Sequence, residues 1–301
     1  MSSTNLRPGT AAALQTVSFV ERSLKLLPLV SEDKAEALQF LAARPLHTVF
    51  MAGFIHDNGL VSPMNRGTFY GVRNERDRLE GVALIGNITL IEADSESAVA
   101  AFARLAQQDP STNIILGEQE RVWRFWNYFS QEGQTPRRVR RQLLLEQRWP
   151  VEMREGVSEL RQATLDDLPA LLPVCAEMSF EESGVNPMEK DPEGFGKRWA
   201  CRVEMGRVWV WMKDGKLVFN ADVICDTTDV IYLEGIYVHP QERGRGYGLR
   251  CLSQLSSHLL RRAGSLCLLV NEQNYEAQAF YRAAGFKMRG YYDTIYLHQE
   301  N

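Results

Sequence analysis

The sequence is poor in cysteine and histidine, and neither residue is placed as a metal or disulfide framework requires. Its 301 residues include five cysteines, all in the second half of the chain and none in a C-x-x-C pair. An odd, scattered set of this kind indicates buried or free thiols in a reducing compartment. The five histidines do not cluster either. We therefore expect no metal site.

Long apolar runs and an excess of one charge are also missing. No stretch is long enough to span a bilayer, and the first residues lack the apolar core of a signal peptide. The formal net charge of −4 argues against a general nucleic-acid binder. We expect a cytoplasmic protein with neither membrane nor nucleic acid as partner. The length suits two domains of about 150 residues each.

The most informative stretch is a glycine-rich loop, QERGRGYG, between a strand-like run at 230–238 and a helix-like run at 249–264. The first amides of a helix are unpaired and attract anions. Glycines let the backbone approach a ligand closely, and arginines add positive charge beside it. The loop therefore predicts a diphosphate-binding cradle, formed by Gln241, Arg243, Gly244, Arg245, Gly246, Tyr247 and Gly248.

Spacing separates this loop from two other phosphate-binding loops. A P-loop has a Lys-Ser/Thr pair after its last glycine, whereas Gly248 is followed by Leu249 and Arg250. A dinucleotide-binding loop has an acidic residue about 20 residues further on. The corresponding region, 264–268, contains no acid.

A second motif follows the loop after about 30 residues. The pattern Gln/Arg-x-x-Gly-x-Gly/Ala is present as Gln241, Gly244 and Gly246, and NEQNYEAQAFYRAAGF follows at 271–286. Together the two motifs resemble the GNAT superfamily of acyl-CoA-dependent N-acyltransferases, over residues 156–301. The resemblance implies an α/β fold with a central mixed sheet flanked by helices. It also implies acetyl-CoA as acyl donor, CoA as product, and an amine of a small molecule or peptide as acceptor.

The resemblance further implies roles for individual residues. Backbone groups of the central strand would pair with the pantetheine arm, as a peptide pairs with a sheet edge. Tyr281 would be the general acid, although a core aromatic is the alternative, and Asn274 would cap a helix and contact the cofactor. Glu234, expected on the same strand face as Ile236, would be the base, or else a structural or substrate-binding acid. The implied cofactor contacts outside the glycine loop are Ile236, Tyr237, Val238, Asn274, Phe280 and Tyr281, and Glu181 and Glu182 are candidates for holding a cationic amine.

The order of expected elements in the first half repeats in the second, so the chain looks like two tandem GNAT-like domains. In the first half, the stretch between central strand and helix, Ile88 to Phe102, has no glycine but carries Glu92, Asp94 and Glu96. Carboxylates there would repel a pyrophosphate by about 1 kcal/mol per close pair in water. We expect a flexible tail at 1–16, a degenerate domain without a phosphate loop or CoA at 17–150, and a catalytic domain at 151–301.

Two clusters have a functional and a structural interpretation. Five arginines in 134–150 suit a phosphorylated or nucleic-acid substrate, but an exposed strand face or interdomain salt bridges are favoured; they are Arg137, Arg138, Arg140, Arg141 and Arg148. Trp123 and Trp126, at helical spacing, are expected in the core.

The leading hypothesis is an acetyl-CoA-dependent N-acetyltransferase that acts by direct attack of an amine. One alternative is a non-catalytic acyl-CoA-binding sensor or interaction protein, and another is an aminoacyl-tRNA-dependent transferase. The acceptor, the acyl chain length and the choice between monomer and homodimer stay open at this stage.

Overall fold

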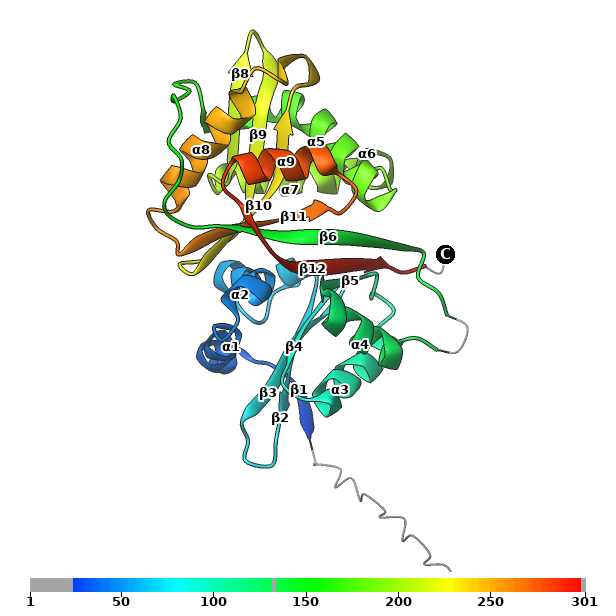
Figure 1. Cartoon of the computed structure of the whole chain (residues 1–301). Helices are drawn as coiled ribbons and strands as arrows, with labels where there is room; N and C mark the ends of the chain where they lie inside the picture. The colour runs from blue at the N-terminus through cyan, green and yellow to red at the C-terminus, as the bar shows by residue number, and fades with distance from the viewer. Residues whose placement is uncertain (1–23, 132–133, 299–301) are drawn as a thin grey trace, which may run out of the picture.

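The computed structural model describes residues 24–131 and 134–298, and the tail expected at 1–16 lies outside them. The described residues form one mixed sheet of twelve strands, flanked by helices (Figure 1). The predicted fold class is therefore confirmed.

The first half contains the predicted order of helices, hairpin, strand, helix, strand and helix. Its elements are β1 (Lys25–Pro28), α1 (Lys34–Leu41), α2 (Pro45–Asn58), β2 (Gly67–Arg73), β3 (Leu79–Gly86), β4 (Ile88–Ala93), α3 (Glu96–Gln107), β5 (Ile114–Glu118) and α4 (Gln119–Phe129). The Ser95 hydroxyl caps α3 by accepting a hydrogen bond from the Ala98 amide at 3.3 Å. The chain turns between β3 and β4 at Gly86, where a Cβ would lie 2.5 Å from Gly67 Cα.

The second half follows a joining strand, β6 (Arg138–Gln147). Its elements are β7 (Arg161–Gln162), α5 (Leu168–Ser183), α6 (Pro187–Lys190), α7 (Pro192–Glu204), β8 (Val208–Lys213), β9 (Lys216–Asp226), β10 (Val230–Val238), α8 (Tyr247–Leu259), β11 (Ser265–Asn271), α9 (Tyr275–Ala283) and β12 (Lys287–Tyr296). The hairpin predicted at Asp214-Gly215 joins β8 and β9, with φ of 51° and 73° at the two residues. Positive φ at both positions is what a tight hairpin turn requires.

The two halves share strands at the middle of the sheet. The strand order is β1-β2-β3-β4-β5-β12-β6-β11-β10-β9-β8-β7. The last strand, β12, lies antiparallel between β5 and β6, and β6 pairs on its other side with β11. In Figure 1, β6 and β12 cross the molecule between its two helix-covered parts. The domain division at residue 150 stays a prediction, since the halves on either side of it complete one sheet.

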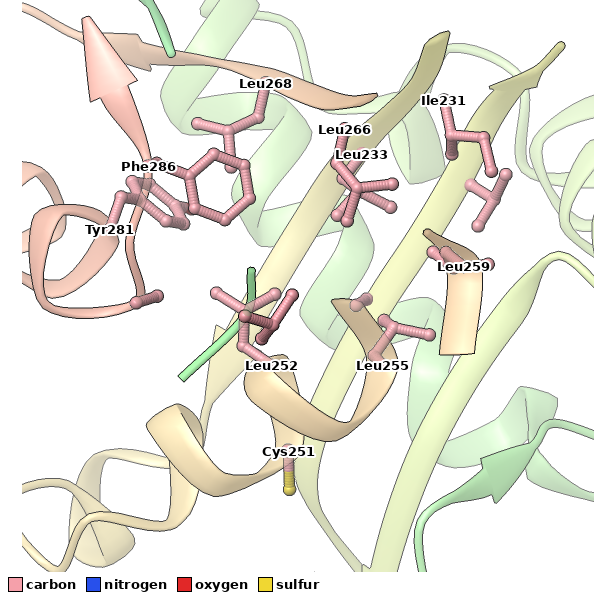
Figure 2. Packing of buried hydrophobic residues seen from close by; sticks show 14 of the residues in the cluster. Ile231, Leu233, Cys251, Leu252, Leu255, Leu259, Leu266, Leu268, Tyr281 and Phe286 are labelled. Carbon is pink, nitrogen blue, oxygen red and sulfur yellow. The ribbon is translucent and has the colours of Figure 1, made fainter. Parts of the chain in front are cut away.

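The core of the second half fixes the helix that begins in the glycine loop. Leu252, Leu255 and Leu259 of α8 pack against β10 and β11, as Figure 2 shows. Burial of each leucine contributes roughly 2 kcal/mol. At the start of the helix, a Cβ on Gly248 would lie 2.8 Å from Val238 Cγ2 and 3.0 Å from the Phe280 ring. Glycine at this position therefore brings α8, β10 and α9 into close contact.

The cysteines are free thiols, as expected, and all but Cys201 are buried. Over residues 24–131 and 134–298, no helix is both long and apolar enough to cross a membrane.

Candidate functional site

Strands β10 and β11 lie side by side only at their beginnings. Three parallel pairs join them, ending at Tyr232 and Cys267, although β10 continues to Val238 and β11 to Asn271. Beyond Tyr232, β10 keeps its antiparallel pairing with β9. The edge of β10 that faces β11 is therefore open from Leu233 onward, as the expected pantetheine site requires.

A bulge in β10 separates two groups of site residues. The register with β9 shifts between Glu234 and Tyr237, and Gly235 has a φ of +62°. A Cβ on Gly235 would lie 2.6 Å from Asp222 Oδ2, so the bulge needs glycine. Glu234 and Ile236 consequently line different cavities. The prediction that Glu234 and Ile236 lie on the same strand face was wrong, because the bulge interrupts the alternation of side chains in a regular strand.

The first cavity has a volume of about 710 Å³ and brings together most of the predicted cofactor residues. Those that line it are Ile236, Tyr237, Val238, Arg243, Gly244, Gly246, Tyr247, Gly248, Asn274, Phe280 and Tyr281. Gln241 and Arg245 are not among its lining residues. The Gln241 amide donates to His239 Nδ1, and Arg245 forms an ion pair with Glu242 at 2.8 Å.

The glycine loop has the geometry of an anion cradle. Gly244 and Gly246 have φ of +74° and +78°, and a Cβ on either would meet no atom within 4 Å. Gly246 is the N-cap of α8, and no side chain hydrogen-bonds there, so the first amides of the helix are available to a ligand. The Arg243 Nε donates to the Val238 carbonyl at 3.1 Å, which fixes the loop to the end of β10. These residues fit the diphosphate of acetyl-CoA.

Tyr281 of α9 and Asn274, the N-cap of that helix, also line this cavity. Tyr281 is buried, and its ring packs against Phe280 and Phe286, with centroids 5.3 and 5.9 Å away. Burial, together with the charge of Glu182, raises the pKa of Tyr281, so the phenol keeps its proton. Asn274 Oδ1 accepts from the Ala277 amide at 3.0 Å, which confirms the predicted helix cap.

A second cavity of about 790 Å³ adjoins the first, and Met178 of α5 lines both. Four carboxylic acids line it: Glu182 on α5, Asp191 between α6 and α7, Asp222 on β9 and Glu234 on β10. Burial raises the pKa of Glu182 to about 7, with a contribution from the charge of Glu234. It also raises the pKa of Asp222 to about 8. The pKa of Glu234 is raised for the same reason, although its surface is open to the cavity and Arg202 opposes the shift.

Sequence reasoning missed several residues of the second cavity. Asp222 was detectable, because a carboxylate inside the apolar run FNADVIC is unusual in a buried strand. Arg198 and Arg202 lie one turn apart on α7, which is also the spacing of an ordinary solvated face. Arg66 comes from the first half of the chain, and no local pattern links it to this site.

Several members of the arginine cluster make contacts within the chain, as the structural interpretation predicts, whereas Arg137 lines the second cavity. Arg141 pairs with the buried Asp293 at 3.2 Å, and Arg148 with Glu146 at 2.8 Å. Trp126 lies in the core, as predicted, and Trp123 Nε1 donates to Asp293 at 2.6 Å.

The first half differs from the second where the cradle would be. Only two residues separate β4 from α3 there, and the Ser95 side chain already caps the helix. Glu92 forms ion pairs with Arg44 at 3.1 Å and Arg121 at 3.0 Å. The cavity beside these groups encloses about 20 Å³.

Family models match two parts of the chain. Residues 204–288 match the acetyltransferase (GNAT) domain, and residues 67–170 match a domain of unknown function, DUF4081. The first match contains the glycine loop and Tyr281. The second contains β2 to β6 and the link into α5.

Individual proteins are similar over shorter or longer parts. A curated relative, the peptidyl-lysine N-acetyltransferase YjaB of Salmonella typhimurium, is 37% identical over 59 residues, which are 20% of this chain and 38% of that protein. The chain thus spans about two fifths of that relative's length.

Solved structures match along nearly the whole chain. An acetyltransferase of the GNAT family from Colwellia psychrerythraea is 14% identical, with a TM-score of 0.59 over 92% of this chain and all 100% of its own. A tandem GNAT protein from the clavulanic acid biosynthesis pathway is 13% identical, with a TM-score of 0.57 over 93% of this chain and 100% of its own. Residues 204–288 are therefore similar to a GNAT acetyltransferase domain, and the chain as a whole has the fold of a tandem GNAT protein.

Proposed function

We propose that the protein is an acetyl-CoA-dependent N-acetyltransferase that transfers the acetyl group directly to an amine. The observation that carries this proposal is the meeting of two cavities at Met178. The glycine loop and Tyr281 line one of them, and the other is lined by Glu182, Asp222 and Glu234. A donor and an acceptor bound in them would meet beside the bulge in β10.

The first cavity suits the donor along its length. Amides at Gly244, Gly246 and the start of α8 would hold the diphosphate, and the open edge of β10 at 236–238 would pair with pantetheine. Asn274 and Phe280 would contact the same arm. Acetyl-CoA, when bound, supplies a thioester whose acetyl group can pass to a nucleophile.

Proton transfer falls to groups on both sides of the bulge. Glu234 accepts a proton from the acceptor's ammonium, and its raised pKa makes it a stronger base than an exposed carboxylate. Tyr281 donates its proton to the leaving sulfur. General acid or base catalysis of this kind typically contributes about 10²- to 10⁴-fold each.

The first half has a different part in this proposal. It binds no CoA, because Glu92 and its arginine partners stand where the cradle would be. It supplies Arg66, Asn87 and Asn113 to the lining of the second cavity, which we call the acceptor cavity. The free thiols support a cytoplasmic location.

Calorimetric titration of acetyl-CoA tests the donor site. We expect one-site binding by the wild type and at least a tenfold loss in Gly246→Glu, since a carboxylate near phosphate costs about 1–4 kcal/mol per pair at 4 Å in water or at an effective dielectric of 20. Gly246→Ala is the matched control: it shares the strain of a φ of +78° but adds no charge, and a Cβ there meets no atom within 4 Å.

A screen of amines by release of free CoA then tests transfer. Absence of binding to the wild type would overturn the donor assignment. Binding without transfer to any amine would favour the non-catalytic sensor instead.

A further inference from the structure

The acceptor cavity also carries positive charge, which comes from both halves of the chain. Arg66, which precedes β2, lines the cavity together with Arg198 and Arg202 of α7. The Arg66 side chain is open to the cavity, and its pKa is lowered by the surrounding protein and by the charges of Arg198 and Arg202. The three guanidinium groups therefore face a shared space.

Among the described residues, neither Arg66 nor Arg202 forms an ion pair with a carboxylate. The Arg66 guanidinium donates to Asn87 Oδ1, a neutral acceptor, at 2.5 Å. The Arg202 guanidinium lies 5.2 Å above the Trp199 ring, and Arg198 pairs with Asp191 at 3.1 Å.

A cation cluster of this kind is costly unless an anion joins it. Like charges held close together in a partly buried cavity repel one another. Ionisable groups with shifted pKa values that line a cleft are typical of binding sites. Guanidinium is also the group that best matches the geometry of carboxylate and phosphate, because it can donate two parallel hydrogen bonds. The cluster is thus complementary to an anionic group on a ligand.

The same cavity holds Glu182, Asp222 and Glu234 beside the donor site. Its lining therefore carries both signs of charge, and Arg202 is near enough to the acids to oppose the pKa shifts of Asp222 and Glu234. A cationic amine fits the acids and an anion fits the arginines. A lysine side chain of a peptide presents an amine without an anion joined to it, and leaves the arginines unmatched.

We propose that the acceptor is a small amine that also carries a carboxylate or a phosphate, and that Arg66, with Arg198 and Arg202, binds this anionic group. The inference rests on the proposed acetyltransferase function. In the reaction the ammonium first gives one proton to Glu234. The amine nitrogen then forms a bond to the acetyl carbon, the carbon–sulfur bond breaks, and the sulfur receives a proton from Tyr281. The second proton that the nitrogen loses restores the phenol of Tyr281. The anionic group is unchanged and serves to position the amine.

Matched acceptor pairs test the proposal with the full-length protein. Acetyl transfer is measured for ω-amino carboxylates from glycine to 6-aminohexanoate against alkylamines of the same length, and for O-phosphoethanolamine against ethanolamine. We expect kcat/KM at least tenfold higher for the anionic member of one or more pairs. The arms distinguish carboxylate from phosphate.

Variants then assign the preference to Arg66. Because a hydrogen bond to a charged group is lost, Arg66→Gln should raise KM for the preferred anionic acceptor roughly 10- to 100-fold. It should leave kcat, the KM of the neutral partner and acetyl-CoA binding nearly unchanged, and Arg66→Lys should restore part of the loss. Arg76→Gln, in the exposed turn between β2 and β3, is the control and should change none of these.

The outcomes separate this inference from the function on which it rests. Equal or better transfer to the neutral amines would overturn the inference and leave the acetyltransferase standing. An Arg66→Gln variant that slows all acceptors alike would show a structural role and overturn it too. Absence of transfer to every amine would overturn the proposed function, and the acceptor class with it.

Discussion

Substitution of Asp222 tests whether burial in the acceptor cavity keeps a carboxyl group protonated at neutral pH. Its side chain is 2% exposed and lies opposite Glu234 in the pairing of β9 with β10. Burial raises the pKa of Asp222 from 3.8 to about 8, although the charge of Arg202 acts in the opposite direction. At neutral pH the carboxyl is therefore protonated in the folded protein and ionised in the unfolded chain.

The sign of the stability effect follows from this shift. Because the pKa of Asp222 is raised on folding, the contribution of this group to the free energy of unfolding is largest below pH 3.8. That contribution falls as the pH rises to about 8. Each pKa unit corresponds to about 1.36 kcal/mol. Between about pH 5.5 and 8, this one group should thus cost the wild type about 3 kcal/mol.

The substitution Asp222→Asn removes the ionisation and keeps an oxygen that can accept from Asn220 Nδ2, which now lies 3.2 Å from Asp222 Oδ1. Urea unfolding followed by tryptophan fluorescence, at roughly pH 5.5, 7 and 8.5, gives the free-energy difference between variant and wild type. We expect the variant to gain about 3 kcal/mol relative to wild type over this range.

Asp226→Asn is the matched control on the same strand. Asp226 is partly exposed and pairs with Arg262, so its loss should change stability by a constant amount over this pH range. A difference between Asp222→Asn and wild type that is also constant would refute the reasoning, because it would place an ionised carboxylate at 222 in the folded protein.

Three further predictions test the site and the shared sheet. Tyr281→Phe should keep the packing of α9 and the Kd for acetyl-CoA in calorimetry but lower kcat about 10²-fold or more; a loss of binding instead would make the residue a cofactor contact. The kcat of transfer should rise with pH above the range in which an exposed carboxyl titrates, because burial raises the pKa of Glu234 and the base must have lost its proton. Glu234→Gln should flatten this rise in steady-state kinetics, and an unaltered profile would assign the base elsewhere. Residues 151–301 expressed alone should fail to fold, because β11 and β12 lose their pairing with β6. Co-expression with residues 1–150 should restore a soluble complex. Cooperative urea unfolding of the 151–301 fragment by itself would contradict this.

Local signals were sufficient for most elements and for the donor cavity. The cap of α3 at Ser95, the cap of α9 at Asn274 and the glycine loop each depend on residues within a few positions of one another. Such patterns can be read from sequence because the atoms that satisfy the backbone are close along the chain. The bulge at Gly235 also had a signal, since glycine inside a strand often marks one.

Contacts between the halves had no such signal. The pairing of β12 with β5 joins residues more than a hundred positions apart, and nothing in either strand specifies its partner. Arg66 reaches the acceptor cavity through the same arrangement. Its function therefore becomes visible only when the two halves are seen together.

The shared sheet explains how a half without a phosphate cradle can still shape the site. Strand β6 belongs to the first half in sequence, yet its Arg140 lies 3.7 Å from Glu182 of α5, and its Arg138 donates to the Glu181 carbonyl at 3.3 Å. The helix that carries one acid of the acceptor cavity is thus held in part by the first half. Arg66 then adds a cation from the same half to the lining of that cavity. Acids and cations of the acceptor cavity thus both depend on the first half, so substitutions there should alter acceptor recognition without affecting the glycine loop of the donor cavity.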